Sequence, residues 1–320
     1  MKKNTLKNNS GLTLIEILVG VVVSAIMITA MYTTYSVVNN SYSKVTDRAK
    51  ISRAGRDIVE LLMRDIRMAG FKYILGTNDL GFTTRTYLEF VGGDTTVERS
   101  HDAIIIESGK TALGPGVDDG ETYGRHDDRD QCCDRIHIVY DDFDQNDEVQ
   151  PYKRYKVTYY AAAISDISES GKDPDEQKRV TDDKRYAVYK SLKSWVQPLG
   201  ADGVPAETGD WDPNCGECYT GEKIRDYIVD MEFIPLDARG RRISPLPSPT
   251  SVAGRASLNK IRAIDIKLTF RSKNFFYRFK AKEGSPRIVK ALSDRTQKFT
   301  DRFLRDAVVV TVYTRNIGTY

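Results

Sequence analysis

One carboxylate stands where a membrane-facing sequence rarely tolerates one. A short basic leader ends at Gly11, an apolar run begins at Leu12, and Glu16 lies inside that run. No further charged residue follows before Lys44. A charge in a lipid-facing helix costs about 2.5–3.5 kcal/mol at the bilayer centre and less near an end, so we expect Glu16 to have a partner. The nearest candidate is an α-amino group, created if the chain is cut after Gly11.

The stretch Gly11-Leu12-Thr13-Leu14-Ile15-Glu16 and the apolar run after it resemble the start of type IV prepilins and type II secretion pseudopilins. Leu12 stands where Phe is commoner, and the resemblance covers only this N-terminal part. It implies that prepilin peptidase cuts between Gly11 and Leu12 and that the new amine of Leu12 is N-methylated. It also implies that Glu16 pairs with the Leu12 amine of a neighbouring subunit during assembly.

Two simpler interpretations explain less. A secretory signal peptide has an apolar core of about 7–15 residues and a small-x-small cleavage site, whereas this run is longer and Ile28-Thr29-Ala30 has a bulky first residue. A plain single-span anchor fits the length of the run. It gives no reason for Glu16 or for Gly11 at its position.

A second resemblance is carried by Arg67-Met68-Ala69-Gly70-Phe71, which is similar to the turn after the pilin helix in PilW-family minor pilins. The closing Thr314-Arg315-Asn316 resembles the last strand of PilW-like and J-type pseudopilin domains. These likenesses imply a minor pilin in a priming or tip complex, with other minor pilins and the major pilin as partners. They place the prepilin in the inner membrane, single-pass with a periplasmic C-terminal domain, and the assembled subunit at the cell surface.

Two alternatives remain open. One is a J-type minor pseudopilin of a type II secretion system, which shares the N-terminal helix. The other is a tip-exposed binding module for surfaces, DNA or calcium. An enzyme is not expected, because the scattered His101, His126 and His137 form no catalytic pattern, and His137 is expected at the surface or at a sheet edge.

The charges are unevenly distributed, although the net charge is only +3. Residues 118–148 contain 12 acidic and 3 basic residues, and residues 235–305 contain 18 basic and 5 acidic residues. These segments are either two solvated surfaces or a complementary contact between subunits. Nucleic acid is not an expected partner, although the basic segment permits phosphate contacts.

The cysteines Cys132, Cys133, Cys215 and Cys218 indicate two disulfides in an exported domain. Since adjacent cysteines close a strained ring, we expect bridges that join the 132/133 loop to the 215/218 loop. Cys215-Gly216-Glu217-Cys218 is not a haem-attachment motif, because Tyr219 follows it where His is needed. A zinc site suits a vicinal pair poorly.

Oxygen ligands at alternate positions, as in calcium loops, occur at Asp142, Asp144 and Asn146, next to Asp141. The loop departs from the EF-hand pattern, because Asp147 replaces the turn glycine and Lys153 replaces the final glutamate. A solvated acidic turn is the alternative to a short calcium site.

The elements around these residues indicate an α+β protein of type IV pilin-like fold, with a long N-terminal α-helix packed on an antiparallel β-sheet with large loop insertions. We expect a leader at 1–11, a transmembrane or filament-core helix at 12–38, its amphipathic continuation at 39–70, and a β-rich domain at 71–320. The continuation has an apolar stripe, and Gly70 can end it in a left-handed conformation. The stripe is formed by Ile51, Ala54, Ile58, Leu61 and Leu62.

Strands are predicted where β-branched and aromatic residues cluster. The alternation of Ile264, Ile266 and Leu268 with Asp265, Lys267 and Thr269 predicts a half-buried strand. Polar loops are predicted at 114–134, 165–185, 200–221 and 240–256. The predicted strands are 87–91, 103–107, 135–140, 155–160, 224–234, 261–270 and 307–313.

Overall fold

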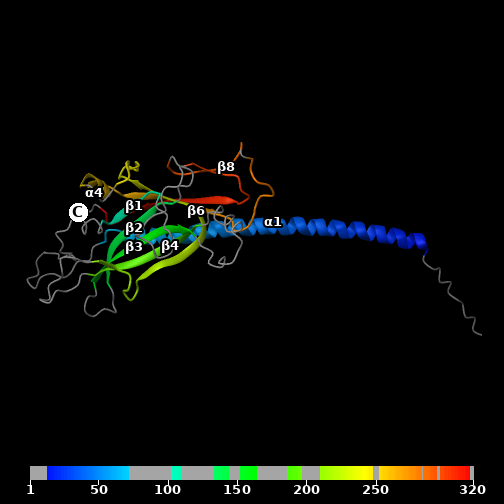
Figure 1. Cartoon of the computed structure of the whole chain (residues 1–320), viewed down its shortest axis with the longest axis horizontal. Coiled ribbons are helices and arrows are strands. Elements are labelled where there is room, and N and C mark those ends of the chain that lie inside the picture. The colour runs from blue at the N-terminus through cyan, green and yellow to red at the C-terminus, as the bar shows by residue number, and fades with distance from the viewer. Residues whose placement is uncertain are drawn as a thin grey trace, which may run out of the picture. The chain divides into compact units, whose positions relative to one another are not determined.

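The computed structural model describes a long helix and an antiparallel sheet (Figure 1). The residues that it describes are 13–71, 102–109, 133–143, 152–163, 186–196, 210–247, 252–282, 284–293 and 296–317. The chain forms two compact units, Met1–Ala49 and Lys50–Tyr320. The predicted fold class, a long N-terminal helix with an antiparallel sheet, is confirmed.

Helix α1 spans Leu14–Met68, and the predicted end at Gly70 is confirmed. Gly70 has a φ of +74°, which a residue without a Cβ adopts without strain. Its N–H donates to the Val139 carbonyl at 2.8 Å, and the Asn316 side chain donates to the Arg67 carbonyl at 3.2 Å. The end of α1 is therefore tied both to the strand that contains Val139 and to the C-terminal segment.

All strand pairs of the main sheet are antiparallel, in the order β1-β2-β3-β4-β6-β7-β10, with β5 paired to β4. A separate hairpin is formed by β8 and β9. The strands are β1 Ile104–Glu107, β2 Arg135–Phe143, β3 Tyr152–Ala163, β4 Tyr186–Val196, β5 Asp210–Asp212, β6 Tyr219–Leu236, β7 Ala263–Arg271, β8 Arg287–Lys290, β9 Thr296–Phe299 and β10 Arg305–Tyr313, and a short helix, α4, spans Val252–Leu258.

One face of the sheet packs against the last five turns of α1. The helix contributes an apolar stripe, and the sheet contributes the inward side chains of β2, β3, β6 and β7. Leu61, which the sequence places on this stripe, is 36% exposed instead, because the stripe turns away from it. The buried helix residues are Ile51, Ala54, Ile58, Val59, Leu62, Ile66 and Ala69.

Gly55 lets the helix approach the sheet closely. A Cβ added at Gly55 would overlap the Cγ2 of Val308 on β10 and lie 3.7 Å from Phe270 on β7. The position therefore needs a residue without a side chain because of the neighbouring strand, and its backbone conformation is ordinary helix.

Gly55→Ala is expected to lower the free energy of unfolding by about 1–3 kcal/mol, the usual cost of overpacking a core, despite the better helix propensity of alanine. Truncating the neighbour in Gly55→Ala/Val308→Ala should recover part of this loss. Chemical unfolding of the detergent-solubilised chain, followed by tryptophan fluorescence, measures both variants. Gly216→Ala, where the added Cβ meets nothing within 4 Å, is the control, and strictly additive losses would contradict the close approach.

A buried polar cluster also joins α1 to the sheet. The Tyr159 hydroxyl on β3 donates to Asp65 Oδ2 at 2.6 Å, and the Lys190 ammonium on β4 lies 2.9 Å from the same oxygen. Asp65 is 6% exposed and Tyr159 is fully buried. Burial, with the adjacent Asp65 charge, raises the pKa of Tyr159 well above its usual value, so the phenol stays protonated as a donor.

The second face of β7 is covered too, which corrects the prediction that residues 261–270 form a half-buried strand. Lys267 and Thr269 on β7 are 7% and 0% exposed. The segment between β7 and β10 lies against this part of the sheet, where the buried Glu232 of β6 accepts hydrogen bonds from the Leu292 and Ser293 amides at 2.6 and 2.7 Å. Alternation along one strand cannot reveal a cover supplied by another segment.

The strand predictions at 103–107, 135–140, 155–160, 224–234, 261–270 and 307–313 are confirmed with shifted bounds. The strand predicted at 87–91 and the loop at 165–185 lie outside the described residues, as does nearly all of the loop at 114–134. The predicted loops at 200–221 and 240–256 are wrong in part, because they contain β5, the first residues of β6 and the start of α4. The strands β4, β8 and β9 were not predicted.

Candidate functional site

The start of α1 is held by a reciprocal cap between Thr13 and Glu16. The carboxylate oxygen Oε2 of Glu16 accepts from the Thr13 amide at 2.9 Å and from the Thr13 hydroxyl at 2.8 Å. The Glu16 amide in turn lies 3.4 Å from the Thr13 hydroxyl oxygen. This is a capping box, which satisfies amides that the first helical turn leaves without a helical partner.

The cap fixes Glu16 in the first turn of α1, next to the predicted cleavage position. Both hydrogen bonds that its carboxylate accepts from the described residues use Oε2, and neither uses Oε1. Gly11 and Leu12 lie outside the described residues, and the predictions made for them stay predictions. The Thr-x-x-Glu spacing was present in the sequence and could have revealed this cap.

The apolar part of α1 in the first unit exposes its large side chains, with exposed fractions from 44% at Val23 to 82% at Leu14. Within the part of the chain that the structure describes, α1 is the one helix that is long and apolar enough to cross a membrane. None of its most apolar stretch is buried. This length and composition fit the apolar helix expected after the processing motif.

Hydroxyl side chains in this apolar part are satisfied inside the helix. Ser24 donates to the Gly20 carbonyl at 2.7 Å, and Thr29 donates to the Ala25 carbonyl at 2.8 Å. Thr33 and Thr34 both donate to the Ala30 carbonyl. Such internal bonds remove the need for outside partners, as a helix surrounded by lipid or by apolar neighbours requires.

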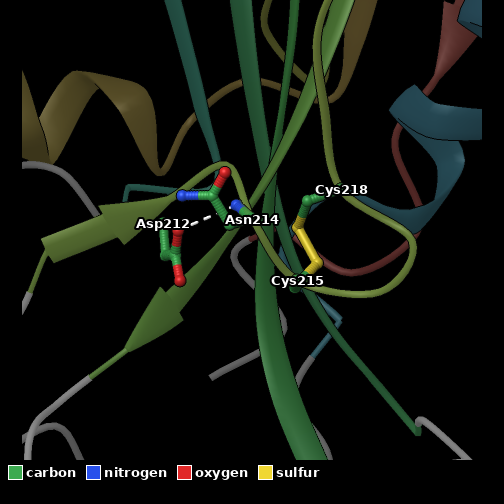
Figure 2. Close-up of a disulfide and its surroundings, with 4 residues drawn as sticks. All are labelled: Asp212, Asn214, Cys215 and Cys218. Carbon is green, nitrogen blue, oxygen red and sulfur yellow. Dashed lines mark hydrogen bonds between the residues drawn. A yellow bond between two sulfur atoms is a disulfide. The ribbon is translucent and has the colours of Figure 1, made fainter.

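The disulfide prediction is wrong about connectivity. Cys215 is bonded to Cys218 within one turn between β5 and β6, with a Cα–Cα distance of 4.8 Å (Figure 2). Cys133 is also disulfide-bonded, and Cys132 lies outside the described residues. The turn brings the pair together locally, because the Cys218 amide donates to the Cys215 carbonyl at 2.9 Å. Spacing alone gave no sign of this turn.

The same turn is preceded by a second local contact. The Asn214 amide donates to the Asp212 carboxylate at 2.8 Å, which forms a local turn immediately before Cys215 (Figure 2). A carboxylate that accepts an amide two residues on is a common turn-forming device. The Cys215–Cys218 bridge therefore closes a small surface turn and joins no distant loops.

The calcium prediction is only partly covered by the structure. Asp142 lies in β2 with Lys153 as its Cα partner on β3, while Asp144 and Asn146 lie outside the described residues. The neighbouring Asp141 is fully buried and is bound by the Arg154 guanidinium at 2.6 and 3.2 Å. Within the described ranges, no group of three His, Cys, Asp or Glu side chains could hold a metal ion. Calcium binding therefore stays an untested prediction.

His137 is buried, which corrects the expectation that it lies at the surface or at a sheet edge. It is 7% exposed, and its Nδ1 lies 2.9 Å from the Thr158 hydroxyl on β3. Its Nε2 is 3.6 Å from Glu107 on β1, which also lies 3.6 Å from Arg135. This is a structural polar cluster on the second face of the sheet, built by three adjacent strands.

The cleavage motif, the capped Glu16 and the apolar helix together define a protein with a prepilin-type N-terminus. Residues 6–32 match the family described as the prokaryotic N-terminal methylation motif, which covers Gly11, Leu12 and Glu16. The chain therefore carries the N-terminal methylation motif of type IV prepilin-like proteins. A search of curated proteins found no match.

Among solved structures, the chain is similar to "Type IV-like pilin TTHA1219 from Thermus thermophilus". The alignment covers 84% of this chain and 98% of that chain, at 8% sequence identity and a TM-score of 0.38.

Proposed function

We propose that this chain is a minor pilin-like subunit of the PilW type, which prepilin peptidase cuts between Gly11 and Leu12 and which then takes part in type IV pilus assembly. The observation that carries the proposal is the methylation motif over residues 6–32, with Glu16 held in the first helical turn. The subunit is structural, and no reaction is assigned to it.

The geometry at Glu16 supports a role in assembly. Cleavage after Gly11 would place a positive amine on Leu12, one residue before the capping Thr13. Because Thr13 occupies Oε2 of Glu16, Oε1 is available to the Leu12 amine of a neighbouring subunit. Pairing would neutralise two charges that are costly in an apolar helix bundle. It would also fix the stagger between adjacent subunits.

The exposed apolar helix and the β-rich unit have different roles in this proposal. The helix enters the inner membrane as a prepilin and afterwards the helix bundle of the filament, where lipid or neighbouring helices cover its side chains. The β-rich unit selects other minor pilins and the major pilin in a priming or tip complex. The Arg67–Phe71 turn, which resembles that of PilW proteins, supports the pilus over a J-type pseudopilin of a type II secretion system.

Deleting the gene in its native host and examining filaments and secretion together separates the two systems. We expect surface pili to be lost or strongly reduced, while type II secretion substrates still leave the cell. When the gene is reintroduced, the chain should be found in sheared pili. Normal piliation with a secretion defect would overturn the pilus assignment in favour of the pseudopilin. A variant in which Gly11 is replaced by Val, which should remain uncut, is the control that ties both phenotypes to processing.

A further inference from the structure

The segment Ser272–Leu304, here called the β7–β10 excursion, is attached to the sheet by backbone and side-chain hydrogen bonds. It contains the β8–β9 hairpin and leaves the sheet between Arg271 and Arg305, which are Cα partners. The Ser272 amide donates to the Leu304 carbonyl at 2.8 Å, and Glu232 holds its far turn through the two amide contacts described above. The side chains of its described residues are therefore presented from a backbone that is bonded to the sheet.

This excursion is strongly cationic. It contains nine basic and three acidic residues, a net charge of +6. The carboxylate of Asp301 is bound by the Arg305 guanidinium, with one hydrogen bond of 2.8 Å, so it does not offset the lysines. The exposed lysines of the excursion form no ion pair within the described ranges of the chain. They are Lys273, Lys280, Lys282, Lys290 and Lys298.

Large apolar side chains are exposed between these lysines. Phe275 and Phe279 are 59% and 71% exposed, and Ile288 and Leu292 are 54% and 36% exposed. The Arg302 guanidinium lies 3.8 Å from the Phe275 ring centroid, so charge and ring are presented together. A surface with both charged and apolar groups fits a partner with anionic groups above an apolar layer.

The position of the excursion within its unit also fits such a partner. It rejoins the sheet at Arg305, three residues before Val308, which contacts α1 at Gly55, near the Lys50 end of this unit. The residues before Lys50 lead to the predicted membrane-spanning segment. Figure 1 shows the excursion (orange) at the opposite end of this unit from α4. The excursion thus lies toward the end of the unit where the chain enters from the membrane segment.

We propose that the β7–β10 excursion binds the anionic headgroups of a lipid bilayer while the chain is anchored by its N-terminal helix. The exposed lysines meet the lipid phosphates, and Phe275 and Phe279 enter the headgroup boundary, as aromatic side chains beside basic residues do at membrane surfaces. Ile288 and Leu292 favour lipid over nucleic acid, because aliphatic side chains have no ring on which bases stack. The proposal rests on the membrane anchoring in the proposed function, and it requires neither cleavage nor filament assembly.

Hydrogen–deuterium exchange of the full chain in liposomes tests this site. The liposomes contain phosphatidylcholine alone or with phosphatidylglycerol. We expect amides of residues 272–304 to exchange about fivefold or more slowly with the anionic lipid, since basic side chains near such a surface are attracted to it, and high salt should abolish the difference. The turn at 237–241, with two arginines of its own, should show no lipid dependence.

Charge-reversal variants distinguish binding by this surface from a general electrostatic attraction of the chain to anionic lipid. Lys280→Glu/Lys282→Glu should remove the protection, whereas Lys260→Glu, at an exposed lysine beside α4, should leave it unchanged. Phe279→Ser should weaken the protection at constant charge. Equal exchange in both lipids would overturn the proposal, and so would protection by a short single-stranded DNA without any lipid effect. Neither result depends on whether Gly11 is cut. A failure of the lipid-binding proposal can therefore be distinguished from a failure of the proposed function.

Discussion

Asp65→Ala is expected to lower the free energy of unfolding by about 3–5 kcal/mol, the range for removing one partner of a buried ion pair. The change leaves the Lys190 ammonium, whose side chain is only 17% exposed, without its carboxylate, and the buried Tyr159 hydroxyl without its acceptor. It also releases α1 from β3 and β4. Chemical unfolding of the detergent-solubilised chain, followed by fluorescence of Trp195 and Trp211 on the sheet, measures the loss.

Asp57→Ala is the matched control, because Asp57 lies on the exposed face of the same helix and loses the same chemical group. It should change the stability by less than about 0.5 kcal/mol, as most surface substitutions do. The double variant Asp65→Ala/Lys190→Met should recover much of the loss by removing the unpaired charge. Equal small effects of Asp65→Ala and Asp57→Ala would show that the buried cluster does not hold the helix.

Glu16→Gln is expected to leave processing intact and to reduce the amount of this chain in filaments about tenfold or more, which corresponds to about 1.4 kcal/mol of lost stabilisation per subunit. Glutamine keeps the oxygen that caps Thr13 but loses the negative charge that would neutralise the amine of a neighbour. Quantitative immunoblots of sheared filaments and of membranes measure the distribution. The mass of the membrane-bound chain shows whether cleavage has occurred.

Thr13→Val separates the cap from the charge. It removes the hydroxyl that donates to Glu16 at 2.8 Å and keeps the carboxylate. We expect a smaller loss from filaments than for Glu16→Gln, because a missing N-cap weakens one helical turn by about 1 kcal/mol. If Thr13→Val is lost from filaments while Glu16→Gln is incorporated normally, the role of Glu16 is capping and the proposed charge pairing is wrong.

Local features were predictable from the sequence where the cause is also local. The apolar run with Glu16, the end of α1 at Gly70 and the alternating strands each follow from residues within a few positions of one another. The cap between Thr13 and Glu16 has the same origin, and its spacing could have been recognised.

Features made by distant segments were not predictable in this way. Asp65 is acceptor to Tyr159 across 94 positions, and a helical aspartate beside arginines has the ordinary pattern of a solvent-exposed face. Lys190 gives β4 a polar appearance although it points toward the helix side of the sheet, paired with Tyr159. His137 is buried beside Thr158 and Glu107 of neighbouring strands, and Lys267 is buried where another segment lies against the sheet. Neither cause is contained in the pattern of a single strand.

The most direct test of the account is intact-mass spectrometry, without reduction, of the chain from membranes and from sheared surface filaments. We predict a mature chain that starts at N-methylated Leu12, has all four cysteines oxidised, and is present in the filament fraction. A chain that retains Met1 and occurs only in membranes would contradict it. That result would leave a single-span anchored protein whose role depends on its β-rich unit alone.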